Sequence, residues 1–270
     1  MDANSLMATW PTGAAAALWR LDGAATCEWS WGDSATVRPW ASITKMAVAM
    51  AIGVEVGWGS HRFEELAGPT GSTVAHLLSH ASGLGTEVGS LGAQMGTKRI
   101  YSNAGYDLLA AHVVRDGDVG QWLSSRVGEA MGLSSWEFDG RPAGGLRGSL
   151  EDLSSFMVGW MRGDCLDPVT HRIMTSPFLP DIGGVTPGFG SFTPNWWGLG
   201  PEIKGNKTHW MGSAFSPRSF GHFGRSGSIL LIDPEAQIGV CALSDEPYGS
   251  WSHELWPALL DRLHRDATGQ

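Results

Sequence analysis

Strand patterns lie at both ends of this 270-residue chain, and helical patterns fill the stretch between them. Residues 15–20 and 25–31 are apolar-rich runs on either side of an Asp-Gly pair, which is a strong β-hairpin signal. Towards the other end, residues 195–204, 228–232 and 238–243 also have the character of strands. Because a two-stranded ribbon alone is only marginally stable, we expect the two ends to join in one antiparallel sheet.

Helical patterns separated by glycine-rich breaks occupy the middle of the chain, and one more closes it. They span residues 42–56, 74–80, 104–115, 119–131, 150–161 and 251–264. The predicted class is therefore α/β of the α+β type, an antiparallel sheet built from both termini and flanked by helices, with an all-helical lobe inserted. We predict one domain over residues 1–270, with a sheet lobe of about 1–41 and 190–270 and a mostly helical lobe of about 42–189.

Charge and hydropathy exclude several classes of partner. The chain has 18 Lys and Arg against 27 Asp and Glu, a formal charge of −9, which is the wrong sign for a nucleic-acid-binding surface. No run approaches the ~18–20 apolar residues of a membrane helix, so we expect no membrane partner. The first residues lack a basic segment followed by a long apolar run, which predicts a cytoplasmic protein. Cys27, Cys165 and Cys241 form no paired motif and are expected to be reduced thiols.

Ser42 and Lys45 form an S-x-x-K motif at the start of the most apolar predicted helix. On a helix, this i, i+3 spacing places both side chains on one face. A serine hydroxyl is a poor nucleophile at neutral pH and needs a base beside it, and a lysine can be that base where burial lowers its pKa. The other interpretation is that Ser42 caps the helix and Lys45 is solvated, although the helix dipole disfavours a lysine in the first turn.

Tyr101 and Asn103 form a Y-x-N triplet beside the helix predicted at 104–115. In a chain this poor in Tyr and Asn, such a triplet is expected by chance only about 0.04 times. A tyrosine near a lysine can relay a proton, and an Asn carboxamide can orient that lysine or bind a substrate amide. The alternative is a turn in which Asn103 caps the helix.

His222 and Gly224 belong to an H-x-G triplet before the strand predicted at 228–232, and the triplet alone is uninformative. If this segment lies beside Ser42, the backbone N–H groups of Arg225 and Ser42 would form an oxyanion hole. Gly224 would let a substrate approach that backbone closely. The Arg225 side chain either binds a substrate carboxylate or is an exposed strand charge.

In this order, the three motifs resemble those of the penicillin-recognising serine enzymes, the superfamily of serine β-lactamases and DD-peptidases. His222-Phe223-Gly224 stands where that superfamily carries its third motif, K-T-G. Residues 74–84, 101–109 and 221–234 also look like the branch of class C β-lactamases and DD-peptidases. The fold that this resemblance implies is the sheet with a helical lobe expected above.

The resemblance implies a role for each motif residue. Ser42 would be acylated, and Lys45 and Tyr101 would share general-base and general-acid work. Asn103 and His222 would bind the substrate and complete the hydrogen-bond network. The leading hypothesis is a serine hydrolase that forms an acyl-enzyme with a small-molecule ester, amide or β-lactam and uses no cofactor.

Two alternative functions stay open. The first is a true β-lactamase or a D-Ala-D-Ala carboxypeptidase, although His222 stands where β-lactamases normally have lysine. The second is a non-catalytic ligand-binding member of the fold, which the intact motif side chains disfavour. The sequence leaves the substrate and the oligomeric state open.

Two further patterns have structural interpretations. His76 and His80 have the i, i+4 spacing of a metal-binding pair but no third ligand within sequence reach, so we predict no metal site. Trp196, Trp197 and Trp210 either line an apolar acyl pocket or belong to the core and rim.

Overall fold

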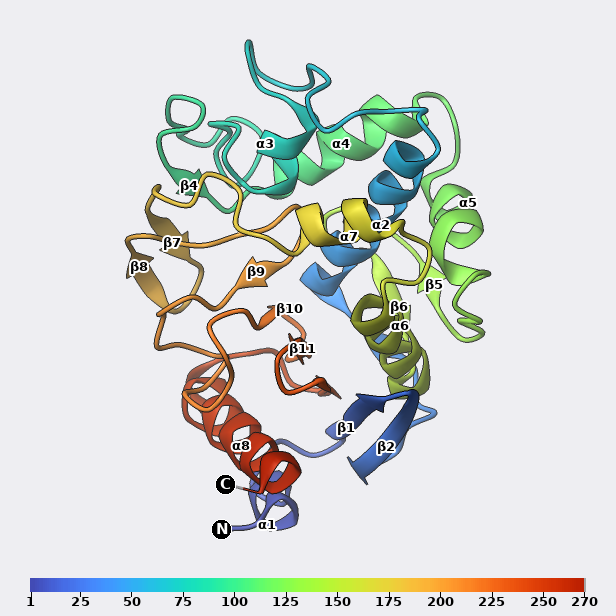
Figure 1. Cartoon of the computed structure of the whole chain (residues 1–270), viewed down its shortest axis with the longest axis vertical. Coiled ribbons are helices and arrows are strands. Elements are labelled where there is room, and N and C mark those ends of the chain that lie inside the picture. Colours follow the sequence, from blue (N-terminus) through green and yellow to red (C-terminus); the bar gives the residue numbers. More distant parts are fainter. Residues whose placement is uncertain (270) are drawn as a thin grey trace.

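The computed structural model describes residues 1–269 and contains a six-stranded antiparallel sheet joined to a group of helices (Figure 1). The sheet order is β2-β1-β12-β11-β10-β9. Its strands are β1 (Ala15–Asp22), β2 (Ala24–Trp31), β9 (Glu202–Ile203), β10 (Phe220–Phe223), β11 (Ile229–Asp233) and β12 (Ile238–Leu243). β1 pairs with β12 so that Ala15 lies opposite Leu243. The two ends of the chain therefore share one sheet, which confirms the predicted fold class.

The rest of the chain forms helices and two small sheets. The helices are α1 (Ala3–Met7), α2 (Thr44–Gly57), α3 (Val74–Leu78), α4 (Asn103–Val114), α5 (Val119–Leu123), α6 (Leu150–Arg162), α7 (Pro168–Met174) and α8 (Ser250–Thr268). One small sheet has the order β3-β6-β5 (Arg38–Pro39, Leu146–Gly148, Glu137–Phe138), and the other β4-β7-β8 (Arg99–Ile100, Gly184–Thr186, Gly190–Phe192). None of the helices in residues 1–269 is long and apolar enough to cross a membrane.

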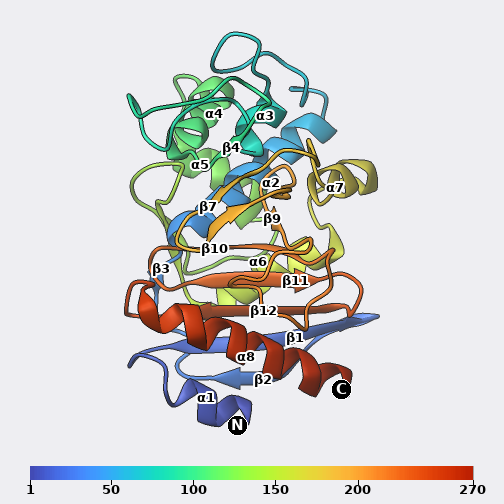
Figure 2. The same cartoon turned by 90° about the vertical axis from the view of Figure 1, so that its left-hand side faces the viewer.

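Both faces of the large sheet are covered. Ala15, Ala17 and Cys241 pack into one core cluster with residues of α2 and α6, whereas Ala16 and Val240 pack into a second cluster with residues of α8. This alternation follows from the two-residue period of a strand. Figure 2 shows α8 running across the near face of these strands, with α6 behind them. Burial on both faces explains why β11 and β12 are continuous apolar runs rather than alternating ones.

Some expected elements differ in extent. The strand expected at 195–204 is reduced to β9, because Gly198 and Gly200 interrupt the run and Pro201 has no N–H to donate to a ladder. The helix expected at 119–131 is α5 followed by a π-helical turn, Ser124–Gly128. Helix α6 lies within the segment expected to be helical but packs against β1, β11 and β12 of the large sheet.

Candidate active site

The chain enters α2 through a short 3₁₀ turn, Ala41–Ile43, that carries Ser42. The helix was expected to begin at Ser42 itself, and it begins at Thr44. Ala41, the first residue of the 3₁₀ turn, has φ +46°, a left-handed conformation that is uncommon for a non-glycine residue. This turn places Ser42 on the wall of a cavity while α2 continues into the core.

Lys45 lies within hydrogen-bond reach of Ser42. Its Nζ is 3.3 Å from Ser42 Oγ, and it donates to Asn103 Oδ1 at 2.8 Å and to the carbonyl oxygen of Ala143 at 2.6 Å. The lysine side chain is fully buried. The solvated lysine of the alternative interpretation is therefore wrong, and the first two motifs meet at one atom.

Burial lowers the pKa of Lys45 to about 7. The negative charge of Asp107 and that of Glu87 act against this shift, whereas the positive charge of Arg141 reinforces it. A large fraction of the lysine is therefore neutral near pH 7. A neutral amine next to a serine hydroxyl can accept its proton.

A closed ring of hydrogen bonds holds the lysine and its asparagine in place. Asn103 Nδ2 donates to Glu87 Oε1 at 2.6 Å. Arg141 bridges two carboxylates, donating to Asp107 Oδ2 through Nε at 3.0 Å and lying 2.9 Å from Glu87 Oε2 through Nη2. The backbone N–H of Ala143 donates to Asp107 Oδ1 at 3.3 Å, and its carbonyl accepts from the lysine. The carboxamide is thus oriented with its oxygen towards the lysine, and one of its N–H groups is occupied by Glu87.

We expect substitutions in this ring to move the pH dependence of acylation in opposite directions. Arg141→Gln removes a positive charge and should raise the pKa of Lys45, so the midpoint of kcat/KM against pH shifts upwards. Asp107→Asn removes a negative charge and should shift that midpoint downwards. Both side chains are partly exposed, so 0.5 M NaCl should shrink both shifts. Shifts of the same sign in both variants would contradict an electrostatic role for the ring.

Tyr101 lies against the lysine. Its ring centroid is 4.8 Å from Lys45 Nζ. Burial raises the pKa of its phenol, and an interaction with the Ser42 hydroxyl only partly opposes this. Tyr101 therefore keeps its proton at neutral pH, which suits a proton donor or relay better than a general base.

His222 lies on β10, behind Tyr101 and Trp197. The three rings are in contact, with centroids 5.6–5.8 Å from His222. Its Nδ1 is 2.6 Å from the carbonyl oxygen of Phe223, to which it donates, and burial together with the charge of Lys45 lowers its pKa to about 3. A neutral, 2% exposed imidazole is not on the wall of the cavity, where Phe223 and Arg225 lie instead.

Gly224 lets the end of β10 touch the turn that carries Ser42. A Cβ at this position would lie 3.1 Å from Ala41 Cβ and would overlap Ser228 Oγ and the carbonyl oxygen of Trp40. Ser228 Oγ donates to that same carbonyl at 2.9 Å. The glycine is therefore needed for the close approach of two backbone segments, not only for the approach of a substrate.

Gly224→Ala should lower kcat/KM by about a hundredfold, because an ångström-scale displacement between the two backbones misaligns the reacting groups. Initial rates with a p-nitrophenyl ester, together with circular dichroism to confirm folding, measure this. Gly144→Ala is the matched control, because its added Cβ would make an ordinary 3.7 Å contact with Ala41. Equal activity in Gly224→Ala and Gly144→Ala would mean that the close approach at Gly224 is not needed for catalysis.

The Gly224 contact brings the backbone of Arg225 next to the Ser42 turn. Within residues 1–269, neither the Ser42 N–H nor the Arg225 N–H donates to an acceptor in the protein. Two free N–H groups beside a nucleophile are what an oxyanion hole requires.

These residues border a cavity of about 650 Å³, which is large enough for a small organic molecule. Ser42, Tyr101, Asn103 and Arg225 line it together with the exposed cation Lys98. Apolar side chains also line it, among them Leu91, Ile100, Val185 and Phe223. The cavity thus combines a serine hydroxyl, cationic side chains and an apolar wall.

The tryptophans proposed for an acyl pocket do not line this cavity. Trp197 is buried against His80, Tyr101 and His222. Trp210 is fully buried and donates its Nε1–H to Glu202 at 2.8 Å. Trp197 and Trp210 belong to the core, because each indole is held by partners already inside the protein. Trp196 is only partly buried and donates its Nε1–H to the carbonyl oxygen of Pro180 at 3.0 Å.

His76 and His80 do not converge. His76 Nδ1 is hydrogen-bonded to Thr73 Oγ1 at 2.8 Å, and His80 Nδ1 accepts from the Ser102 N–H at 3.1 Å.

The sequence motifs did not identify the residues that complete the hydrogen-bonded ring around Lys45 and Asn103. Glu87, Arg141 and Ala143 belong to segments far from the motifs, and no local pattern marks them. Asp107 had a usable signal, because it lies four residues after Asn103 and therefore on the same helix face.

A model of the family described as Beta-lactamase matches residues 8–264. The chain is similar to a β-lactamase from Mycobacterium bovis, with 37% identity over 99% of this chain and 100% of that one and a TM-score of 0.94. It also shares its fold with the octameric penicillin-binding protein homologue from Pyrococcus abyssi (19% identity over 100% and 78% of the two chains, TM-score 0.75). The D-amino acid amidase from Ochrobactrum anthropi has the same fold (16% identity over 99% and 96%, TM-score 0.73). No curated protein sequence matches the chain. The match over nearly its whole length means that this chain belongs to the β-lactamase family.

Proposed function

We propose that the chain is a serine hydrolase that forms an acyl-enzyme on Ser42 with small-molecule ester, amide or β-lactam substrates. The observation that carries the proposal is the fully buried Lys45, with a pKa lowered to about 7 and its Nζ 3.3 Å from Ser42 Oγ. A pure binding protein has no need of a base with that pKa beside a serine. The cavity is lined by the same serine.

In the acylation step, neutral Lys45 accepts the proton of Ser42 as Oγ attacks the substrate carbonyl carbon. The carbonyl oxygen becomes an oxyanion, which the N–H groups of Ser42 and Arg225 stabilise. The new C–O bond to Ser42 remains when the bond to the leaving group breaks. The assignment of Lys45 as base and Tyr101 as acid rests on the opposite directions of their pKa shifts.

The proton then passes from the Lys45 ammonium through the Tyr101 hydroxyl to the departing alcohol or amine. Tyr101 gives its own proton and takes one from the lysine, so it ends neutral. Water hydrolyses the ester on Ser42 by the reverse set of transfers, which restores the free serine and releases the acid.

A true β-lactamase or a D-Ala-D-Ala carboxypeptidase is the second candidate. The positive charges of Arg225 and Lys98 at the cavity suit a substrate that carries a carboxylate. The similar chain from Mycobacterium bovis is described as a β-lactamase. Against this stands the neutral His222 at the position of the third-motif lysine.

The test is intact-mass spectrometry of the protein after separate incubations with a fluorophosphonate, benzylpenicillin and a p-nitrophenyl ester. Release of p-nitrophenol, turnover of nitrocefin and release of D-alanine from a D-Ala-D-Ala peptide are followed in parallel. We expect a covalent adduct of one equivalent with the fluorophosphonate and with at least one acyl donor. The fastest turnover separates esterase, β-lactamase and peptidase.

A folded protein that gives neither an adduct nor turnover would overturn the proposal and favour a non-catalytic ligand-binding member of the fold. Reversible protection by penicillin against heat, without a mass shift, would point the same way.

A further inference from the structure

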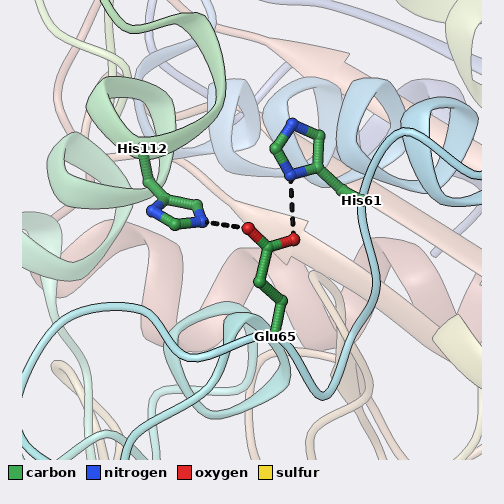
Figure 3. Close-up of side chains that lie close together, drawn as sticks. All are labelled: His61, Glu65 and His112. Carbon is green, nitrogen blue, oxygen red and sulfur yellow. Dashed lines mark hydrogen bonds and ion pairs between the residues drawn. The ribbon is translucent and has the colours of Figure 1, made fainter.

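The side chains of His61, Glu65 and His112, three potential metal ligands, lie close together (Figure 3). None of the three lines the cavity beside Ser42. His61 and Glu65 come from the loop after α2, and His112 comes from the last turn of α4. Their ligand atoms all lie within 4.8 Å of one another. Glu65 and His112, which are 47 residues apart in the sequence, therefore direct their ligand atoms towards the same place.

The two imidazoles approach the same carboxylate from different sides. His61 Nδ1 is 3.0 Å from Glu65 Oε2, and His112 Nε2 is 2.8 Å from Glu65 Oε1. The backbone N–H of Arg62 also donates to Oε2 at 3.4 Å, which helps to orient the carboxylate. A simple ion pair needs one imidazole, whereas two imidazoles and one carboxylate are three of the four ligands of a tetrahedral zinc ion.

The distances suit such an ion after small side-chain movements. Bonds of about 2.0–2.2 Å in a tetrahedron place ligand atoms about 3.3–3.6 Å apart. The carboxylate contacts of 2.8 and 3.0 Å would open slightly, and the two imidazoles would close towards each other. Glu65 is held by its backbone, since its carbonyl accepts from the Val74 N–H at 3.0 Å. The loop is therefore anchored and the side chains alone need to adjust.

The exposure of the cluster leaves room for the fourth ligand. The side chain of His61 is 13% exposed, and those of His112 and Glu65 are 30% and 32% exposed. Water can therefore reach the fourth position. The other ring nitrogens, Nε2 of His61 and Nδ1 of His112, make no hydrogen bond to the protein within residues 1–269, so each can carry the proton that the ligating nitrogen gives up.

The geometry points to a divalent transition-metal site of the zinc class at His61, Glu65 and His112, with water as the fourth ligand. His112 lies nine residues after Asn103 in α4, which is about 13 Å along the helix axis. The ion takes no part in chemistry at Ser42. It fastens the loop after α2 to the helix that carries Asn103.

The experiment is a calorimetric titration of the chelator-treated full chain with Zn²⁺, followed by measurement of Tm with Zn²⁺ or with EDTA. Wild type should bind one Zn²⁺ per chain and gain thermal stability from it. His112→Gln and Glu65→Gln should each weaken binding by at least tenfold and lose the gain in Tm. His253→Gln, a change of another surface histidine on α8, should behave as wild type.

Two results would overturn the site. The first is a folded wild type that binds no Zn²⁺ saturably, which would mean that the cluster is only a pair of hydrogen bonds. The second is equal Zn²⁺ affinity in wild type and in the His61→Gln/His112→Gln double variant. Because these side chains are partly exposed, the variants are expected to fold, and circular dichroism checks this.

Discussion

Ser42→Ala is expected to lower kcat/KM for any acyl donor that wild type hydrolyses by at least about a thousandfold, and to abolish the covalent mass shift. The substitution removes the hydroxyl whose oxygen lies 3.3 Å from Lys45 Nζ, on a residue that lines the cavity. Although the pKa of Lys45 stays low in this variant, the lysine then has no serine hydroxyl to activate. The measurement is intact-mass spectrometry with the fluorophosphonate, combined with initial rates of p-nitrophenol release.

Folding should be unaffected in this variant, because Ser42 lies on a partly exposed turn and alanine fits there. Ser155→Ala is the matched control, since Ser155 lies on the exposed face of α6. If Ser42→Ala forms the covalent adduct to the same extent as wild type, the nucleophile is a residue other than Ser42. Full activity in Ser155→Ala and none in Ser42→Ala would establish Ser42.

Lys45→Met is expected to cause a second loss of about a thousandfold or more, because it removes the proton acceptor but keeps an unbranched side chain of similar length in the core. In wild type, kcat/KM should rise about tenfold per pH unit below pH 7 and level off above it. The sign follows from the base, because protonated Lys45 cannot take the serine proton and its pKa is lowered to about 7. The variant should lack this inflection.

Lys45→Met is expected to lower activity without lowering the free energy of unfolding. The pKa of Lys45 is about 7 in the folded chain, against 10.5 for a free lysine. Between pH 7 and pH 10.5 the unfolded state therefore binds more protons than the folded state. The free energy of unfolding of wild type thus rises with pH across this range. Methionine has no charge to bury, so urea unfolding near pH 6 should show a variant at least as stable as wild type. A marked loss of stability together with the loss of activity would mean that Lys45 holds the fold rather than acting as the base.

The three motifs were recognisable in the sequence because each is short and local. Ser42 and Lys45 are one turn apart, and Tyr101 and Asn103 are two residues apart, so their proximity is a property of the backbone. The ring around them was not recognisable. Glu87 and Arg141 meet only because the loop before β4 and the segment before β6 fold over the start of α4.

His222 illustrates the limit of a motif. Its position suggested substrate binding, yet its ring lies behind Tyr101 and Trp197, with its Nδ1 hydrogen-bonded to the carbonyl of Phe223. The direction in which a strand residue points depends on which face of the sheet is covered, and that face is chosen by distant helices.

The amino-acid sequence by itself determined the secondary structure at the two ends of the chain, the joining of those ends in one sheet, and the motif residues Ser42, Lys45, Tyr101 and Asn103 of the candidate site. Apolar runs, an Asp-Gly turn and an S-x-x-K spacing are sufficient for this, because each acts over a few neighbouring residues. Only the tertiary structure decided that Lys45 is fully buried and that the backbone at Gly224 packs against the turn that carries Ser42. It also decided that His61 and His112 both face the carboxylate of Glu65. Burial and convergence are sums over contacts between distant segments, and it is burial that lowers the pKa of Lys45 to about 7.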